Sequence, residues 1–272
     1  MRALVVGSIT RDTNVFDGVA NHAWGGTALY AARTYIQFGV AVRLVTRLAA
    51  EDQPLIAAQL PEVELIAQAS PATTTFENRY GADEARTQRV AAIAQPIDCR
   101  AEYFDDVDWV HLGPLHPDDL HERWLEKHGE LPAGLDLQGF ARRIERACVI
   151  PDLDARVVDL LPRLQWLKAS RNEWQTLLAH LRISELERPR HGAVETLVTE
   201  GAAGGVLLRD GQRDVRWSAA PPVTDCDPTG AGDVFFAAYL HEHCARRASA
   251  AHAAAAAARF TSAFLLGRRG SH

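Results

Sequence analysis

The chain has 272 residues, of which 47% are hydrophobic and 24% are charged, and it contains no apolar run long enough to cross a bilayer. This composition is typical of a folded globular protein and excludes collagen-like, disordered and membrane-spanning classes. Lysine and arginine total 29 against 35 aspartate and glutamate residues, giving a formal charge of −6. Because nucleic-acid phosphates require a basic face, we expect neither a nucleic-acid nor a membrane partner.

Lysine is unusually rare, because Lys127 and Lys168 are the only two in the chain. A Walker A loop requires Gly-Lys-Ser/Thr after a strand, and a protein kinase requires a lysine in its third strand. Neither lysine has such neighbours. If this protein handles nucleotide phosphates, it must therefore hold them in another way.

The cysteines show no spacing typical of a zinc site or a disulfide framework. They are Cys99, Cys148, Cys226 and Cys244. The N-terminus also lacks the basic region and the long apolar stretch of a signal peptide. These features predict reduced cysteines in a cytoplasmic protein.

Strand and helix patterns alternate along the chain. Apolar strand runs are predicted at 3–9, 42–46, 109–112, 133–137, 165–169 and 195–199. Helical spacing is predicted at 27–38, about 117–127, 231–247 and about 250–266, and a hairpin turns at Asp210-Gly211. This order predicts an α/β fold with a mostly parallel sheet and helices on its faces.

Two segments do not follow that alternation, namely 13–24 and 73–93. Both alternate polar residues with apolar or β-branched residues, which predicts exposed antiparallel strands. We interpret them as a lid over one end of the sheet. The whole chain, 1–272, is then a single domain that carries this lid.

The most informative motif is DPTGAGD at 227–233, which precedes the apolar run VFFAAYL. Small residues let the backbone approach a ligand closely. Residues 230–232 open a helix whose first amides lack intrahelical partners and can bind an anion. Taken alone, an aspartate in the first turn, here Asp233, is also typical of an ordinary helix start.

With this motif the sequence resembles the ribokinase-like, or PfkB, family of carbohydrate kinases. The C-terminal signature of that family, D-T/P-T-G-A-G-D-x-F, matches 227–235 at every specified position. Weaker matches follow the order of the family: Gly7 with Asp12, GGTALYAA at 25–32, Asn172-Glu173, and VTEG at 198–201. The resemblance covers nearly the whole chain. It implies a ribokinase-like three-layer sandwich with a mostly parallel central sheet and a small β lid.

The resemblance implies ATP-dependent transfer of a phosphoryl group to a hydroxyl of a small sugar or polyol. Such a transfer needs a base, stabilisation of the transferred charge and exclusion of water. By matched position, Asp233 is the base, and the backbone amides of Gly230, Ala231 and Gly232 form an anion hole. An anion hole of this kind would explain the absence of a Walker lysine.

Further roles are carried over by matched position. Residues expected to face the acceptor are Asp12, Gly25, Gly26 and Arg142. Residues expected along the nucleotide are Asn172, Thr199, Gly201, Asp227 and Thr229. The resemblance also implies Mg²⁺, and it places Asp227 near a monovalent-cation site. A homodimer is a further expectation, since lids of this family pair between subunits.

Two departures from the family pattern stand out. Tyr30 occupies the position of an asparagine that contacts the acceptor. The N-x-x-E motif, linked to magnesium through water, reads Asn172-Glu173-Trp174-Gln175 here, so Glu173 and Gln175 are the candidate indirect metal residues. The stretches LDLQGFAR at 135–142 and HLGPL at 111–115 resemble a branch with inositol-type kinases, which favours an acceptor with several hydroxyls.

Three alternatives follow from these features. A nucleoside kinase of the same family fits the motifs equally. A catalytically weak binding or regulatory protein is suggested by Tyr30 and Gln175, because fold alone does not fix function. A dinucleotide-dependent oxidoreductase is excluded, since no GxGxxG follows the first strand.

Overall fold

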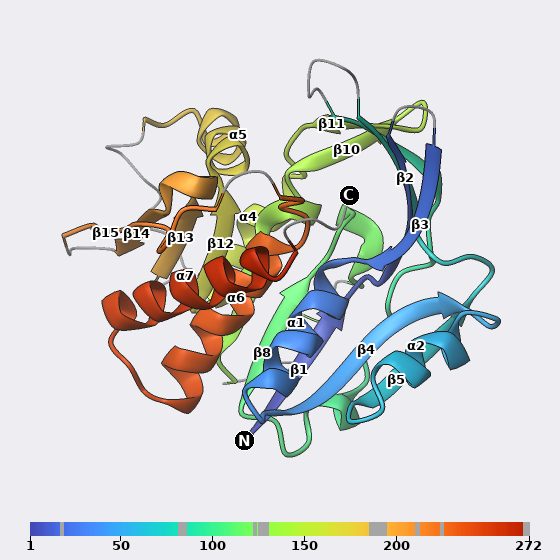
Figure 1. Cartoon of the computed structure of the whole chain (residues 1–272), viewed down its shortest axis with the longest axis horizontal. Helices are drawn as coiled ribbons and strands as arrows, with labels where there is room; N and C mark the ends of the chain where they lie inside the picture. Colours follow the sequence, from blue (N-terminus) through green and yellow to red (C-terminus); the bar gives the residue numbers. More distant parts are fainter. Residues whose placement is uncertain are drawn as a thin grey trace.

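The main sheet has nine strands within the residues that the structure describes. This computed structural model describes residues 1–16, 19–80, 86–121, 124, 131–184, 195–209, 213–223 and 226–268. The strand order is β15-β14-β13-β12-β9-β8-β1-β4-β5 (Figure 1). The strands are β1 (Arg2–Gly7), β4 (Ala41–Ala49), β5 (Glu64–Ser70), β8 (Trp109–Gly113), β9 (Ala133–Asp136), β12 (Trp166–Ser170), β13 (Glu195–Thr199), β14 (Gly205–Arg209) and β15 (Val215–Trp217).

This sheet is mostly parallel. All pairings from β5 to β13 are parallel, and the two pairings at the other edge, β13 with β14 and β14 with β15, are antiparallel. The central strands are buried along almost their whole length, as the apolar runs in the sequence predict. The predicted α/β class with a mostly parallel central sheet is therefore confirmed.

Helices cover both faces of the main sheet (Figure 1). They are α1 (Thr27–Gln37), α2 (Gln53–Gln59), α4 (Arg156–Leu160), α5 (Arg171–Leu181), α6 (Ala231–Leu240) and α7 (Ala250–Leu266). One core lies under α1, α6 and α7, and a second core lies under α4 and α5. The three layers match the predicted sandwich. The predicted helix 231–247 ends earlier as an α-helix, because its last turn is π-helical at His241–Ala245.

The alanine run near the C-terminus forms the buried side of α7. Ala250, Ala253, Ala254 and Ala257 recur at helical spacing and are buried. Because alanine has no side chain beyond Cβ, α7 packs closely on α6. This packing fixes the position of α6, whose first turn carries Asp233.

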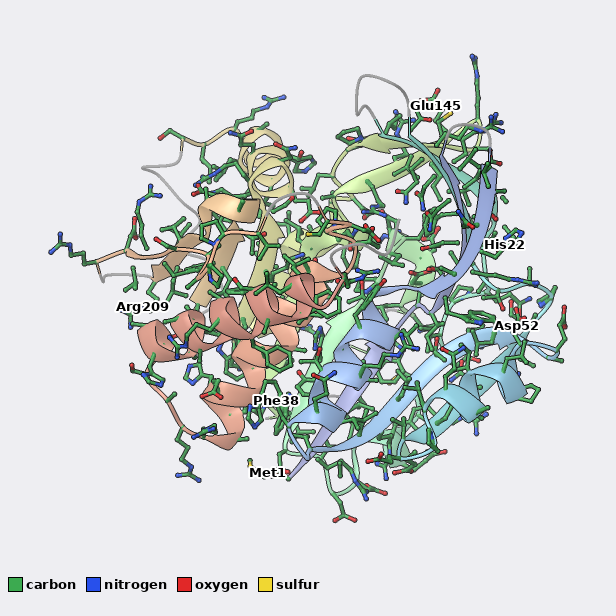
Figure 2. All side chains as sticks on the ribbon, viewed as in Figure 1. Met1, His22, Phe38, Asp52, Glu145 and Arg209 are labelled. Atoms are coloured by element: carbon green, nitrogen blue, oxygen red, sulfur yellow. The ribbon has the colours of Figure 1, made fainter. Side chains whose placement is uncertain are left out.

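A second, smaller sheet has the order β10-β11-β7-β6-β2-β3. Its strands are β2 (Thr10–Phe16), β3 (Val19–Gly25), β6 (Thr75–Tyr80), β7 (Arg86–Ala92), β10 (Arg142–Glu145) and β11 (Cys148–Pro151). It stands at one end of the main sheet, and the exposed His22 and Glu145 lie on it, away from Phe38 at the end of α1 (Figure 2). The segments 13–24 and 73–93 do form strands here, but β2 pairs with β6 in parallel rather than antiparallel.

The sequence does not predict the β10–β11 hairpin. Of the predicted helix at about 117–127, the described residues include a 3-10 turn at Pro117–Asp119 and the helical residue Trp124, and most of the remainder lies outside the described residues. The predicted turn at 210–211 also lies outside them. Within the described residues, no helix is long and apolar enough to span a membrane.

Candidate active site

The carboxyl ends of the parallel strands and the smaller sheet enclose a cavity of about 530 Å³. Its lining residues are Thr10, Asp12, Gly26, Thr27, Tyr30, Phe76, Gln88, Leu115, Gln138, Arg142, Lys168, Glu173, Asp227, Pro228, Thr229, Gly230, Gly232 and Asp233. Open α/β sheets bind their ligands at this edge. Residues that the sequence assigns to the acceptor and residues that it assigns to phosphate transfer therefore meet in one cavity.

The glycine turn opens α6 toward this cavity. Gly230 is the N-cap residue with φ of 82°, a left-handed conformation that favours glycine. A Cβ at Gly230 would also lie 2.6 Å from the ring of Tyr30, so no larger residue fits. The amide of Ala231 donates to the Pro228 carbonyl at 3.0 Å, and Ala231 does not line the cavity. Of the three predicted anion-hole residues, Gly230 and Gly232 are those at the cavity.

Asp233 lies in the first turn of α6 and is 9% exposed. Burial raises the pKa of its carboxyl to about 7, and the neighbouring Asp136 carboxylate acts in the same direction. The Lys168 ammonium and the Thr27 hydroxyl lower this pKa, and Glu173 raises it further. A carboxyl with a pKa near neutrality is suited to accept a proton at physiological pH.

A buried ion pair that the sequence analysis did not assign lies beside Asp233. The Lys168 Nζ is 2.9 Å from Asp136 Oδ2, and the two side chains are 6% and 0% exposed. The two residues are direct partners in the pairing of β12 with β9. Burial alone would lower the pKa of Lys168, but Asp136, Glu173 and Asp233 raise it above its usual value. Lys168 therefore stays charged in the cavity.

The acceptor side of the cavity is built on β2 and β3. Asp12 lies on β2, and a Cβ at Gly25 of β3 would lie 2.6 Å from its Oδ2. Gly26, with φ of 94°, is the N-cap of α1 and would bring a Cβ within 2.3 Å of the Ser8 carbonyl oxygen. Gly25 therefore allows close packing against Asp12, and Gly26 allows α1 to start against the backbone that follows β1. Arg142 reaches the same cavity from the start of β10.

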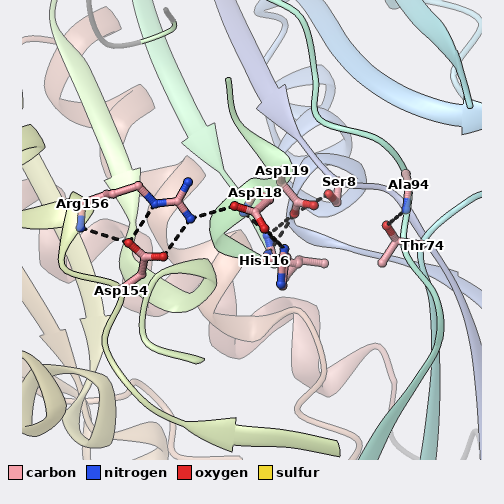
Figure 3. Close-up of polar contacts among 9 residues, drawn as sticks. Ser8, Thr74, Ala94, His116, Asp118, Asp119, Asp154 and Arg156 are labelled. Carbon is pink, nitrogen blue, oxygen red and sulfur yellow. Dashed lines mark hydrogen bonds and ion pairs between the residues drawn. The ribbon is translucent and has the colours of Figure 1, made fainter. Parts of the chain in front are cut away.

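A hydrogen-bond network supports the loop that carries Leu115 (Figure 3). Asp119 is buried, and its Oδ2 accepts from the Ser8 hydroxyl and from the Leu115 amide, both at 2.6 Å. The network continues through Asp118 to Arg156, with an Nη2 to Oδ1 distance of 2.7 Å. These bonds join the end of β1 to the loop after β8, and they hold one wall of the cavity.

The first turn of α5 changes how the predicted metal motif is understood. Ser170 caps this helix, and the side chain of Glu173 accepts from the Ser170 amide at 2.7 Å. Glu173 lines the cavity, whereas Asn172 and Gln175 are exposed and lie outside its lining. The glutamate at the cavity is therefore three residues after the helix cap, and Gln175, two residues further on, lies on the other side of the helix.

The predicted nucleotide residues divide into two groups. Asp227 and Thr229 line the cavity. Thr199 and Gly201 lie at the end of β13 and do not line it. Glu200, between them, is paired with Arg171, and the Arg216 Nη1 lies 3.7 Å from its carboxylate. The side chains at the end of β13 thus present a carboxylate that is held by two arginines.

The family follows from comparison with known proteins. Residues 57–271 match the sequence pattern of the pfkB family of carbohydrate kinases. This chain belongs to that family. No curated protein matches the sequence.

Solved structures of ribokinase-family kinases superpose on the whole chain. A pyrophosphate-dependent kinase in a sulfate complex has 25% identity and a TM-score of 0.83, with 98% of this chain and 96% of that chain covered. A pyrophosphate-dependent kinase with a pyrophosphate analog and myo-inositol has 24% identity and a TM-score of 0.83, covering 98% and 96%. Arabidopsis thaliana ribokinase with ribose and ATP has 18% identity and a TM-score of 0.72, covering 97% and 92%.

Magnesium fits this pfkB site only as an ion shared with phosphates. The described residues contain no group of three or more His, Cys, Asp and Glu side chains that could hold a metal ion. The Asp136 carboxylate is already engaged by Lys168. Magnesium often keeps several waters and is held by substrate phosphates with one or two carboxylates. The cavity is lined by four carboxylates, Asp12, Glu173, Asp227 and Asp233, and Glu173 is the one that the metal motif includes.

Residues that the sequence analysis missed are Asp136, Gln138, Lys168 and Arg268. Lys168 carried a signal, since it is one of two lysines and lies in the middle of a buried strand. Asp136 and Gln138 lie in the LDLQGFAR stretch at 135–142, in which the sequence analysis assigned a role only to Arg142. Arg268 carried no signal, because it follows the last predicted helix.

Proposed function

We propose that this protein transfers a phosphoryl group from a diphosphate-bearing donor to a hydroxyl of a small sugar or polyol. The observation that carries this proposal is the position of Asp233 in one cavity with Asp12 and Arg142 on the acceptor side and the 230–232 turn on the donor side. An acceptor hydroxyl between these two groups faces both a base and a phosphate-binding turn.

In the proposed reaction, Asp233 takes the hydroxyl proton while the acceptor oxygen forms a bond to phosphorus. The bond from phosphorus to the leaving oxygen breaks, and the shortened donor departs. The amides of Gly230 and Gly232 stabilise the charge on the transferred group. Magnesium, when bound with the donor, neutralises phosphate charge. The smaller sheet acts as the lid that keeps water away from the phosphoryl group.

Polar side chains on the acceptor side favour a polyhydroxylated acceptor. Asp12, Gln88, Gln138 and Arg142 all line this cavity. Carboxylate, amide and guanidinium groups together supply acceptors and donors for several hydroxyls. A sugar or a cyclic polyol matches this set, and the myo-inositol bound by the relative described above is of that class.

ATP is the donor that the family signature favours. A second donor, inorganic pyrophosphate, is supported by a specific observation. Thr199 and Gly201, which are expected along a nucleotide, do not line the cavity, and the paired Glu200 carboxylate lies between them. The kinase with 25% identity is pyrophosphate-dependent. A donor without a nucleoside needs no contacts at the end of β13.

The test is a matrix of donors and acceptors with purified protein and magnesium. ATP and pyrophosphate are each combined with ribose, fructose, myo-inositol and inosine, and the phosphorylated product is detected by mass spectrometry. We expect transfer to a sugar or polyol with one of the two donors. Transfer to inosine alone would identify a nucleoside kinase. Donor binding without transfer to any acceptor would contradict the proposal and favour a binding protein.

A further inference from the structure

The ammonium of Lys168 lies directly against the phosphate-binding turn. A Cβ placed on Gly232 would fall 2.9 Å from Nζ and 3.3 Å from Cε of Lys168. The side chain lines the cavity and is nearly buried. Because residue 232 is a glycine without a Cβ, the Lys168 ammonium can lie close to the backbone of the turn.

Carboxylates surround this ammonium. Asp136 contacts it at 2.9 Å, and Glu173 and Asp233 are close enough to raise its pKa. His111 below the site is fully buried, and burial lowers its pKa to about 3, so its imidazole is neutral and adds no positive charge. Lys168 is thus the positive charge among three carboxylates that line or adjoin the cavity.

A phosphate entering this cavity meets those carboxylates at close range. Like charges in a partly dehydrated site repel strongly, so the phosphate requires a cation nearby. An ammonium has three N–H donors, and its bond to one Asp136 oxygen leaves donors that can turn toward the turn at Gly232. Magnesium has no preformed group of ligands in the described residues.

We propose that Lys168 is a built-in cation of the phosphate site and contacts the donor phosphate held at the Gly230–Gly232 turn. Its ammonium carries part of the neutralisation of phosphate charge that magnesium otherwise supplies. Asp136 holds the ammonium in place by the direct pairing of β12 with β9. The inference rests on the proposed function in placing the phosphate at this turn. It adds that phosphate binding persists when divalent metal is removed.

The test measures pyrophosphate binding by calorimetry, without acceptor, first in EDTA and then with magnesium. The variants are Lys168→Gln, Lys168→Arg, Asp136→Asn and the double variant Lys168→Gln with Asp136→Asn. The double variant removes both charges of the Lys168–Asp136 ion pair, so it does not leave the buried carboxylate of residue 136 without its partner. Arg33→Gln is the control, because Arg33 bonds Gln59 on the surface. Circular dichroism and thermal unfolding establish that each variant is folded.

We expect wild type and Arg33→Gln to bind pyrophosphate in EDTA. The double variant should bind roughly 10- to 100-fold more weakly, as expected for a lost charged hydrogen bond, and should need more magnesium for half-maximal binding. Lys168→Arg should recover part of the affinity, and Asp136→Asn alone, which keeps the ammonium, should keep the binding.

Equal pyrophosphate affinity in the folded double variant and wild type would overturn the inference, as would a wild type that binds no pyrophosphate in EDTA. If binding depends on Lys168 but no acceptor is phosphorylated, the inference holds and the proposed function fails.

Discussion

The Arg268 guanidinium donates to the Thr229 carbonyl at 2.5 Å and to the Asp227 carboxylate at 3.2 Å. Its Cζ also lies 5.2 Å from the ring centroid of Phe264. A residue just beyond α7 therefore fixes the loop that precedes the 230–232 turn. It places a permanent positive charge at Asp227, where the family resemblance implies a monovalent cation.

We therefore predict a small effect of potassium on wild-type turnover. Arg268→Gln removes the charge and should lower activity in the absence of potassium, and added potassium should restore part of it. The measurement compares rates in potassium chloride and tetramethylammonium chloride at equal ionic strength. Strong potassium activation of wild type would show that Arg268 does not take over the role of the cation.

Asp233→Asn should lower kcat by about 10²- to 10⁴-fold, the usual contribution of a general base. The amide keeps the shape of the carboxyl, so donor affinity should stay within a few fold. Asp98→Asn is the matched control, because Asp98 pairs with Arg47 at the surface. Turnover comparable to wild type would remove Asp233 from the role of base.

The raised pKa of Asp233 predicts a pH-dependent rate. Below about 7 its carboxyl is protonated and cannot accept a proton, so kcat/KM should rise as pH increases through about 7. The same group lowers stability as pH rises from about 4 to about 7, because the unfolded carboxyl loses its proton first. A pH–rate profile and thermal unfolding at several pH values measure both effects. A flat profile across this range would contradict the assignment.

Asp12→Ala should raise the KM for the acceptor by about tenfold or more and change the KM for the donor little, as expected for a lost hydrogen bond to charge. Asp12 lies on the smaller sheet, across the cavity from the glycine turn. Initial rates with each substrate varied in turn separate the two constants. If the variant loses donor binding and keeps acceptor binding, the donor and acceptor sides of the cavity are assigned the wrong way round.

Glu173→Gln should raise the magnesium concentration for half-maximal rate, while its amide oxygen still caps α5 at the Ser170 amide. Gln175→Glu is the comparison substitution two residues along the helix, and it should leave the magnesium curve unchanged because Gln175 is exposed outside the cavity. Titration of both variants at saturating donor decides between the two positions. If the magnesium curve shifts in Gln175→Glu and not in Glu173→Gln, the alignment of Asn172–Gln175 with the N-x-x-E metal motif is supported instead.

The parts of the fold that repeat regularly could be predicted from the sequence. Continuous apolar runs mark β1, β8 and β12, because both faces of these strands are buried. The β10–β11 hairpin could not be predicted, since its short strands, RRIE and CVIP, alternate too little to show a period.

In the site, motif matching found Asp233 but not its buried neighbours. Lys168 and Asp136 are 32 residues apart and meet only through the strand pairing, which no local pattern encodes. Motif spacing pointed to both Glu173 and Gln175, and of these two Glu173 lines the cavity. The capping box of Ser170 and Glu173, with its Ser-x-x-Glu spacing, is a local signal that distinguishes the two positions.

The smaller sheet is assembled from three hairpins, β2–β3, β6–β7 and β10–β11, which lie in three separate parts of the sequence. Asp233 and Lys168, which we propose act at the phosphate, lie instead on α6 and β12. A substitution on one hairpin, such as at Asp12, Gln88 or Arg142, can therefore alter the lining of the cavity without altering the segments that carry Asp233 and Lys168.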